Sequence, residues 1–163
     1  MIKIVIFRGR PTSGKTTALR TLKKKKAMKE WIIIDHSEIK SRFGKKRGKL
    51  KLFELIKEAM MTGKNILTEE TSRKTLNKHI GKDIKKYKYK ILVFQFTVST
   101  ETAYKRDVKR AKAKWHPFMG KKKIEKLHKM HDERFDKKAI LIDTDKLNKK
   151  QVISFIFKKL RLR

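Results

Sequence analysis

One turn near the start of the chain constrains the possible fold more than any other feature. The residues Gly9-Arg10-Pro11-Thr12-Ser13-Gly14-Lys15-Thr16-Thr17 fit the pattern G-x-x-x-x-G-K-[ST]. The apolar run Ile2–Phe7 comes directly before this turn and predicts a buried strand, and a helical stretch follows from Lys15 to about Lys26. This order of strand, turn and helix is the context in which the pattern binds phosphate groups.

The residue types in the turn suit a nucleoside triphosphate and Mg²⁺. Glycines let consecutive backbone amides converge on a phosphate, and the start of the helix adds the positive end of its dipole. We expect Lys15 to reach the β- and γ-phosphates and the Thr16 hydroxyl to ligate Mg²⁺. The donor is ATP, GTP or another NTP, and the predicted nucleotide-binding residues are Gly9, Pro11, Thr12, Ser13, Gly14, Lys15, Thr16 and Thr17.

Strands and helices alternate along the rest of the chain. Further apolar runs predict strands at Trp31–Asp35, Asn65–Thr68, Lys90–Thr97 and Ala139–Ile142. Helical periodicity predicts helices over 49–62, from Ser72 to about Lys86, from Ser99, over Lys121–Phe135 and over Val152–Leu160. The alternation predicts a single α/β domain over 1–163, with a five-stranded parallel sheet between two layers of helices.

Composition favours a polyanionic partner and excludes several classes of protein. The chain has 48 Lys and Arg against 16 Asp and Glu, which gives a net charge of +32. A surface with this charge attracts polyanions such as nucleic acids, because its cations neutralise phosphate groups. It has no cysteine, which excludes a disulfide scaffold, a thiolate zinc site and Cys nucleophilic catalysis. Its apolar runs fall far short of the roughly 20 residues of a membrane helix. Because no signal-peptide pattern is present either, we expect a soluble cytoplasmic protein without a membrane partner.

Asp35 narrows the class of nucleotide-binding protein. The chain contains no N-K-x-D tetrapeptide, the guanine motif of GTPases. Asp35 comes 20 residues after Lys15, at the end of the very next strand, whereas a motor ATPase carries its acidic metal ligand further downstream. In small phosphate-loop kinases the acid at this strand end serves the acceptor hydroxyl. The spacing therefore favours a kinase.

From Ile2 to Leu160 the chain resembles the polynucleotide 5′-hydroxyl kinases. Beyond the phosphate loop and Asp35, the resemblance is carried by three short segments, Ile66-Leu67-Thr68-Glu69-Glu70-Thr71, Lys105-Arg106-Asp107-Val108-Lys109-Arg110 and Ile140-Leu141-Ile142-Asp143-Thr144. These look like the family's third strand with its acid, its lid with two arginines four residues apart, and its last strand. The resemblance implies a three-layer phosphate-loop kinase fold with a helical lid, here at about 99–120.

The resemblance also implies a role for each matching residue. Asp35 would be the general base. Glu69, in the place of the family's acid, or its neighbour Glu70 is a candidate for holding Mg²⁺ through water, with Thr16 as a direct ligand; the alternative is that both acids cap the following helix. Arg106 and Arg110 lie at i and i+4 on one helical face, so both can close over the donor. We expect Arg110 at the transition state and Arg106 nearer the adenine or the α-phosphate. The implied reaction is transfer of the γ-phosphate to the 5′-hydroxyl of RNA or DNA.

One departure from the family leaves the residue that holds the acceptor unassigned. The family commonly has an Arg three residues beyond the base, and this chain has Glu38, with Lys40 and Arg42 as the nearest basic residues. Glu38 and Arg42 are therefore candidate substrate residues, and a second register makes Glu38 the base and Asp35 structural. The alternatives are a small-molecule kinase for a nucleoside, antibiotic or sugar, and an RNA-binding NTPase assembly factor.

The pair His128 and His131, with Asp132 beside it, has the spacing of a metal edge. Because no third ligand is evident in the sequence, we expect these side chains to form a solvated helix face.

Overall fold

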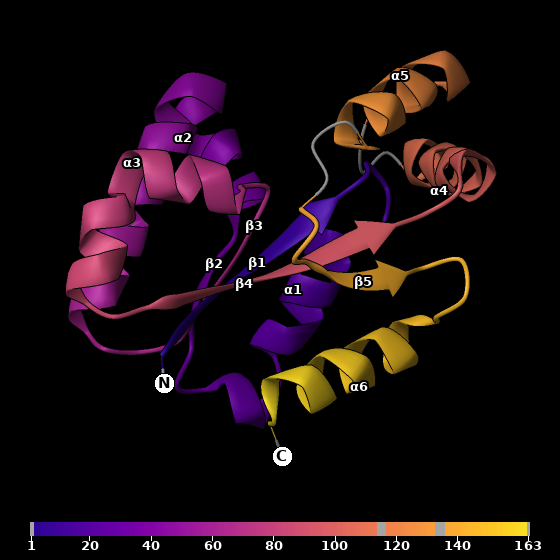
Figure 1. Cartoon of the computed structure of the whole chain (residues 1–163). Coiled ribbons are helices and arrows are strands. Elements are labelled where there is room, and N and C mark those ends of the chain that lie inside the picture. Colours follow the sequence, from indigo (N-terminus) through magenta and orange to yellow (C-terminus); the bar gives the residue numbers. More distant parts are fainter. Residues whose placement is uncertain (1, 114–116, 133–135, 163) are drawn as a thin grey trace.

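The computed structural model describes residues 2–113, 117–132 and 136–162. The strands are β1 (Lys3–Gly9), β2 (Ile32–Ile34), β3 (Ile66–Glu69), β4 (Lys90–Thr97) and β5 (Ile140–Asp143). They form one five-stranded sheet in the order β2-β3-β1-β4-β5, and each pair of neighbours is parallel (Figure 1). Because the strands are parallel, the carboxyl ends of β1, β2 and β3 all lie at the same end of the sheet.

Helices cover both faces of this sheet. They are α1 (Lys15–Lys23), α2 (His36–Met61), α3 (Arg73–Lys86), α4 (Thr100–Lys112), α5 (Lys121–Asp132) and α6 (Lys149–Leu160), with a short 3-10 turn, η1 (Lys26–Met28), before β2. The helices α2 and α3 lie on one face, α1 and α6 on the other, and α4 and α5 beyond the carboxyl ends of the strands (Figure 1). The predicted three-layer α/β fold with a five-stranded parallel sheet is confirmed.

The central strand β1 is apolar on both faces because both faces are covered. Ile4 and Ile6 are fully buried in the core that α2 and α3 close, and Val5 and Phe7 are fully buried in the core that α1 and α6 close. Successive side chains of a strand point to opposite faces, so a continuous apolar run satisfies two cores at once. This strand delivers the phosphate loop from the middle of the sheet.

The helix α2 begins thirteen residues before the predicted helix 49–62, at His36. Asp35 caps it, accepting a hydrogen bond from the amide of Glu38, and the chain bends at Gly44, where φ is 73° and ψ is 172°. The polar segment before this bend lacks the apolar periodicity on which the prediction of the helix depended. The bend divides α2 into a short half beside Asp35 and a long half that packs on the sheet.

The segment after β4 carries the predicted lid. Within 99–120 the structure has α4, and the buried carboxylate of Asp107 accepts hydrogen bonds from the amides of Met119 and Gly120 just before α5. Residues 114–116 of the predicted lid, and 133–135 at the end of the predicted helix Lys121–Phe135, lie outside the described residues. In the part of the chain that the structure describes, no helix is both long and apolar enough to span a membrane.

Candidate active site

The turn between β1 and α1 has the backbone shape that a phosphate loop requires. Gly9, Thr12 and Gly14 have positive φ angles of 142°, 59° and 88°. Residues of positive φ between residues of negative φ turn successive backbone amides towards the inside of the turn. A Cβ on Gly9 would lie 2.0 Å from the carbonyl oxygen of Phe96 in β4, so only glycine fits there. Position 9 is therefore fixed both by its φ and by the close approach of the neighbouring strand.

The turn presents uncompensated hydrogen-bond donors. The helix α1 starts after Gly14 with no side-chain cap and no acidic residue in its first turn. The hydroxyls of Thr12 and Ser13 are buried and have no hydrogen-bond partner in the described structure. Free donors at a helix N-terminus are the chemistry that binds an anion.

Lys15 is buried inside the loop that it serves. Its Nζ donates to the carbonyl oxygens of Gly9 at 3.0 Å and Arg10 at 2.9 Å. Burial lowers the pKa of Lys15, and the nearby carboxylates of Glu70 and Glu69 oppose that shift. The two carbonyl oxygens are neutral, so they do not neutralise the ammonium group of Lys15, and its charge is available to an incoming phosphate.

Glu69, at the end of β3, lies against the loop and fits a metal ion. Its Oε2 accepts a hydrogen bond from Thr16 Oγ1 at 2.7 Å, and its Oε1 accepts one from Ser37 Oγ at 2.9 Å. Burial raises the pKa of Glu69 despite these hydrogen bonds, and the carboxylates of Glu70 and Asp35 raise it further. A buried carboxylate beside a hydroxyl supplies the oxygen ligands that Mg²⁺ takes from proteins, the remainder coming from water and phosphates.

Asp35 closes β2 with both carboxylate oxygens engaged. Oδ1 accepts from the amide of Glu38 at 3.1 Å, and Oδ2 accepts from Arg20 Nε at 2.9 Å. Burial acts to raise the pKa of Asp35, but the hydrogen bonds from Arg20 and from the Glu38 amide outweigh it and lower the pKa. The group is therefore an anion at neutral pH, which a proton acceptor needs to be.

The two lid arginines have different surroundings. Arg106 donates to the carbonyl oxygen of Thr12 at 3.2 Å and to the hydroxyl and carbonyl of Thr144 at 3.0 and 2.8 Å, so it joins the phosphate loop to the turn after β5. Arg110 has a buried Nε without a hydrogen-bond partner among the described residues, and its charge contributes to lowering the pKa of Lys15. Arg110 is thus the lid arginine whose buried Nε has no partner among the described residues and whose charge acts on Lys15 of the loop.

The structure separates the two candidate bases. Asp35 is buried at the strand end, whereas Glu38 is exposed one turn into α2 and accepts from Arg42 Nη2 at 2.6 Å. Thr17, the last residue of the pattern, is also exposed. The residues brought together at the carboxyl edge of the sheet are the phosphate loop, Lys15, Thr16, Asp35, Glu69 and Arg110.

The expectation of a solvated face at His128 and His131 is wrong. His128 is only 4% exposed, and its Nδ1 lies 3.2 Å from Thr100 Oγ1. The pKa of His131 is lowered to about 4, mainly by burial and in addition by the nearby cations Lys15 and Arg8. His128 is buried and His131 is partly buried because α5 packs against α4 and over the phosphate loop, an arrangement that helical periodicity alone does not reveal. Among the described residues, no group of three or more His, Asp or Glu side chains is arranged to hold a metal ion.

A double hydrogen bond fastens α5 to the loop. Arg10, inside the loop, donates Nε and Nη2 to the carboxylate of Asp132 at 3.1 and 2.7 Å, and Nη1 to the carbonyl of Val98 at 2.9 Å. Planar pairing of this kind fixes orientation as well as position. The helix α5 is therefore held next to the phosphate loop.

Arg20 was not found from the sequence, although it donates a hydrogen bond to Asp35. Glu70, the other predicted candidate for Mg²⁺, has φ of 58° and forms an ion pair with Lys40, while its charge acts on Lys15. Only 11 of the 48 basic residues are Arg, so an Arg five residues after Lys15 was a usable signal for Arg20. No sequence signal distinguished Glu70 from Glu69.

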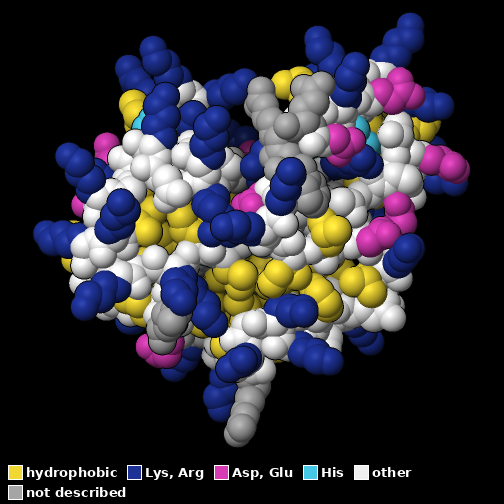
Figure 2. Space-filling model, in the orientation of Figure 1, with side chains coloured by type: hydrophobic (Ala, Val, Ile, Leu, Met, Phe, Trp, Pro, Cys, Tyr) yellow, Lys and Arg dark blue, Asp and Glu magenta, His cyan; other side chains and the backbone are white. Residues whose placement is uncertain are grey.

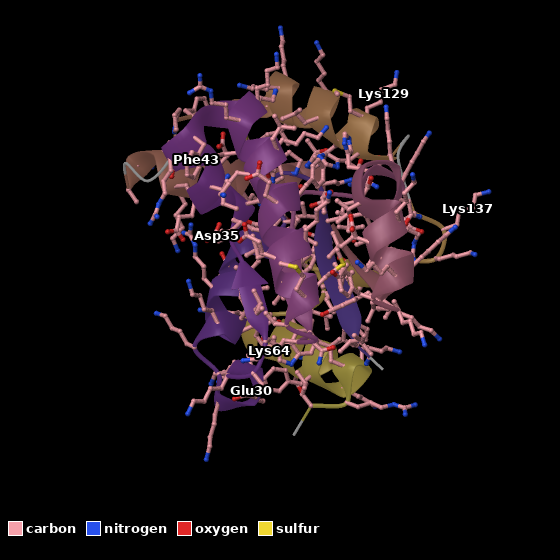
Figure 3. All side chains as sticks on the ribbon, turned by 90° about the vertical axis from the view of Figure 1, so that its left-hand side faces the viewer. Glu30, Asp35, Phe43, Lys64, Lys129 and Lys137 are labelled. Atoms are coloured by element: carbon pink, nitrogen blue, oxygen red, sulfur yellow. The ribbon has the colours of Figure 1, made fainter. Side chains whose placement is uncertain are left out.

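Positive charge surrounds this site without being confined to it. Figure 2 shows Lys and Arg side chains over the whole face that it draws, with few acidic side chains between them. Most of these side chains extend into solvent, as the stick view in Figure 3 shows from another side. Such a surface attracts polyanions through phosphate charge rather than base sequence.

Solved structures share this fold. The chain is similar to a sugar kinase from Janibacter sp. HTCC2649 (TM-score 0.64, 14% identity, 99% of this chain and 96% of that chain). It is also similar to deoxyadenosine kinase from M. mycoides with bound dATP (TM-score 0.57, 18% identity, 97% and 99%). A chain of the Pnkp1/Rnl/Hen1 RNA repair complex matches with TM-score 0.60 and 22% identity over 84% of this chain and 47% of that one.

At these identities the likeness shows the fold alone, and that fold is the P-loop kinase fold. No protein-family model matches the sequence, and no curated protein matches it significantly.

Proposed function

We propose that this protein transfers the γ-phosphate of ATP, or of another NTP, to the 5′-hydroxyl of RNA or DNA. The phosphate loop, the Asp35 carboxylate beside it and the kinase fold support a phosphotransferase with an alcohol acceptor. The observation that carries the choice of a polynucleotide is the net charge of +32, which a small neutral acceptor gains nothing from. One chain of similar fold comes from an RNA repair complex.

In this proposal the chain's own side chains manage a proton and a charge. Asp35 accepts the proton of the 5′-hydroxyl while that oxygen forms a bond to the γ-phosphorus and the bond to the β–γ bridging oxygen breaks. Lys15 and Arg110 stabilise the charge that spreads over the equatorial oxygens. Thr16 and Glu69 would hold Mg²⁺, which would supply further charge neutralisation for the triphosphate.

Two further arginines act by position. Arg106 holds the phosphate loop against the turn after β5 through Thr12 and Thr144. Arg20 fixes the Asp35 carboxylate and keeps it ionised, because it hydrogen-bonds to Oδ2. Arginines that stabilise phosphoryl transfer in related systems contribute about 10³–10⁵ in rate.

An acceptor panel tests the proposal. The protein is incubated with γ-labelled ATP, Mg²⁺ and, separately, 5′-hydroxyl oligonucleotides, nucleosides and sugars. We expect label on the oligonucleotides alone, and we expect binding to weaken with salt by about 0.7 in the log–log slope for each single-strand phosphate contacted. Label on a nucleoside or sugar and none on any oligonucleotide would establish a small-molecule kinase. ATP hydrolysis with no labelled alcohol would indicate the NTPase assembly factor.

Two variants assign the roles within the site. Lys15→Ala should abolish transfer. Asp35→Asn should keep ATP binding but lose about 10²–10⁴ in rate, the usual contribution of a positioned base. Asp143→Asn is the matched control, because Asp143 also ends a parallel strand but pairs with Lys146 on the far side of the sheet. Full activity in Asp35→Asn would show that a group other than Asp35 is the general base.

A further inference from the structure

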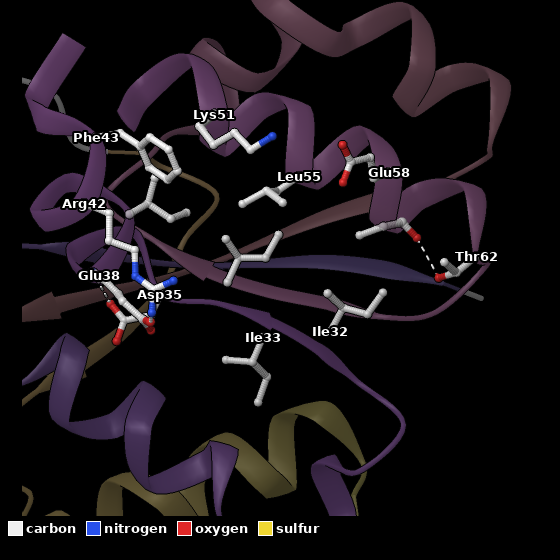
Figure 4. A pocket seen from close by; sticks show the side chains of 13 residues that line it. Ile32, Ile33, Asp35, Glu38, Arg42, Phe43, Lys51, Leu55, Glu58 and Thr62 are labelled. Atoms are coloured by element: carbon white, nitrogen blue, oxygen red, sulfur yellow. Dashed lines mark hydrogen bonds and ion pairs between the residues drawn. The ribbon is translucent and has the colours of Figure 1, made fainter. Parts of the chain in front are cut away.

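A groove starts at Asp35 and runs along the outer edge of the sheet. It has a volume of about 560 Å³ and lies between β2, the edge strand, and the two halves of α2 (Figure 4). Phe43 and Leu55 of α2 face Ile32 and Ile33 of β2 across it. Cavities of this size and apolar lining are typical of sites for small organic groups.

The groove combines an apolar interior with an exposed aromatic ring at its rim. Phe43 and the preceding residue, Arg42, both line the groove. Phe43 is 47% exposed. It precedes the bend at Gly44, which turns the chain away and leaves the ring uncovered. A large exposed aromatic beside an apolar slot suits a flat ring that stacks on one face.

The chain beside Phe43 is strongly basic. Residues 40–51 contain no acidic residue and seven basic ones, which are Lys40, Arg42, Lys45, Lys46, Arg47, Lys49 and Lys51. Of these, Lys45, Lys46, Arg47 and Lys49 are exposed just past the bend. An aromatic ring next to a row of lysines is the pairing that single-stranded nucleic acid uses, the ring for a base and the cations for phosphates.

We propose that this groove receives the nucleobase of the acceptor's 5′-terminal nucleotide, stacked on Phe43, with the phosphates that follow lying against the basic bend 45–49. The inference rests on the proposed function, since the reacting hydroxyl must lie at Asp35, and Asp35 is part of the groove wall. In Figure 3, Phe43 and Asp35 lie along the same side of the molecule. The site binds by stacking, so it accepts any of the four bases.

A fluorescent base tests the assignment. The probe is a 5′-hydroxyl oligonucleotide with 2-aminopurine as its first base, and a second probe carries 2-aminopurine at the 3′ end. We expect the wild-type protein to quench the first probe and not the second. Phe43→Ala should lose that quenching and raise the KM for the oligonucleotide roughly tenfold, the range of one base–aromatic stack, with kcat changed less than about twofold. Leu50→Ala is the matched control, because Leu50 is an apolar side chain of α2 that is 56% exposed and lies outside the groove.

An abasic acceptor separates this inference from the function on which it rests. Removing the first base should raise the wild-type KM about as much as Phe43→Ala does, and the two changes together should add little. If wild type phosphorylates the intact and abasic oligonucleotides equally well, or if Phe43→Ala behaves like Leu50→Ala, the groove assignment is overturned while the kinase remains. If wild type labels no oligonucleotide at all, the proposed function fails and the groove assignment fails with it.

Discussion

The hydroxyl of Thr16 in the phosphate loop donates a 2.7 Å hydrogen bond to Glu69, which is 53 residues away in the sequence. The second carboxylate oxygen of Glu69 accepts from Ser37, at the start of α2. One buried carboxylate therefore connects the loop after β1, the end of β3 and the helix that Asp35 caps. This group therefore links the phosphate loop to the segment that carries Asp35.

Replacing Glu69 with Gln should weaken the response to Mg²⁺. The amide is close in size but carries no charge, and losing such a partner typically costs about 10- to 100-fold in metal affinity. A Mg²⁺ titration of the transfer rate should move to higher concentration by that factor. Glu54→Gln, which removes an exposed carboxylate that pairs with Lys51, is the control. If the Mg²⁺ titration curves of wild type and Glu69→Gln coincide, Glu69 does not help to bind the metal ion.

Replacing Arg20 with Ala should shift the acid limb of the pH–rate profile upward. Burial alone would raise the pKa of Asp35, and the hydrogen bond from Arg20 is the main effect that lowers it. Without Arg20 the carboxylate takes up its proton at a higher pH, so kcat/KM falls earlier on acidification. Arg20→Lys, which keeps the charge but loses the fixed geometry, should shift less. An unchanged acid limb in Arg20→Ala would show that Asp35 does not set it.

His131 should make the fold less stable in mild acid. Its pKa is about 4 in the folded protein, below the ordinary value of 6.5, so between these values the unfolded chain binds a proton that the folded chain does not. The free energy of unfolding therefore falls as pH drops from about 6.5 towards 4. Urea unfolding at pH 7 and pH 4.5 should show a smaller loss in His131→Gln. An equal loss in both proteins would contradict the lowered pKa of His131.

Two glycine substitutions should act in opposite directions. Gly9→Ala places a Cβ 2.0 Å from the backbone oxygen of Phe96, so we expect a loss of stability of about 4 kcal/mol or more. Gly81 lies inside α3, where an added Cβ has only Asn77 at 3.9 Å, and Gly81→Ala should gain about 0.5 to 1 kcal/mol. Chemical denaturation of the two variants measures both changes. A mild effect at position 9 would mean that β4 does not approach the loop so closely.

The sheet was predictable because its strands are short apolar runs covered on both faces. Ile2–Phe7 predicted β1 to within two residues at each end, and Lys90–Thr97 is β4 itself. The first half of α2 could not be predicted in this way. Its helix depends on the cap at Asp35 and on the break at Gly44, and neither produces an apolar period.

The site was predictable where a local motif encodes it and not where the chain folds back on itself. The pattern from Gly9 to Thr17 specified the loop. The contacts of Arg20 with Asp35, and of Arg10 with Asp132, join residues 15 and 122 positions apart. The sequence could have singled out Arg20 as a rare arginine, but it does not name the partner of either arginine. Nor does the sequence show that α5 places His131 near Lys15.

One matched pair of acceptors tests the central claim most directly. The same RNA is prepared with a 5′-hydroxyl and with a 5′-phosphate, and each form is incubated with γ-labelled ATP, Mg²⁺ and either wild type or Lys15→Ala. The account predicts label at the 5′ end of the hydroxyl form with wild type alone, and none on the phosphate form. Binding of ATP by the wild type with no label on either RNA would contradict it.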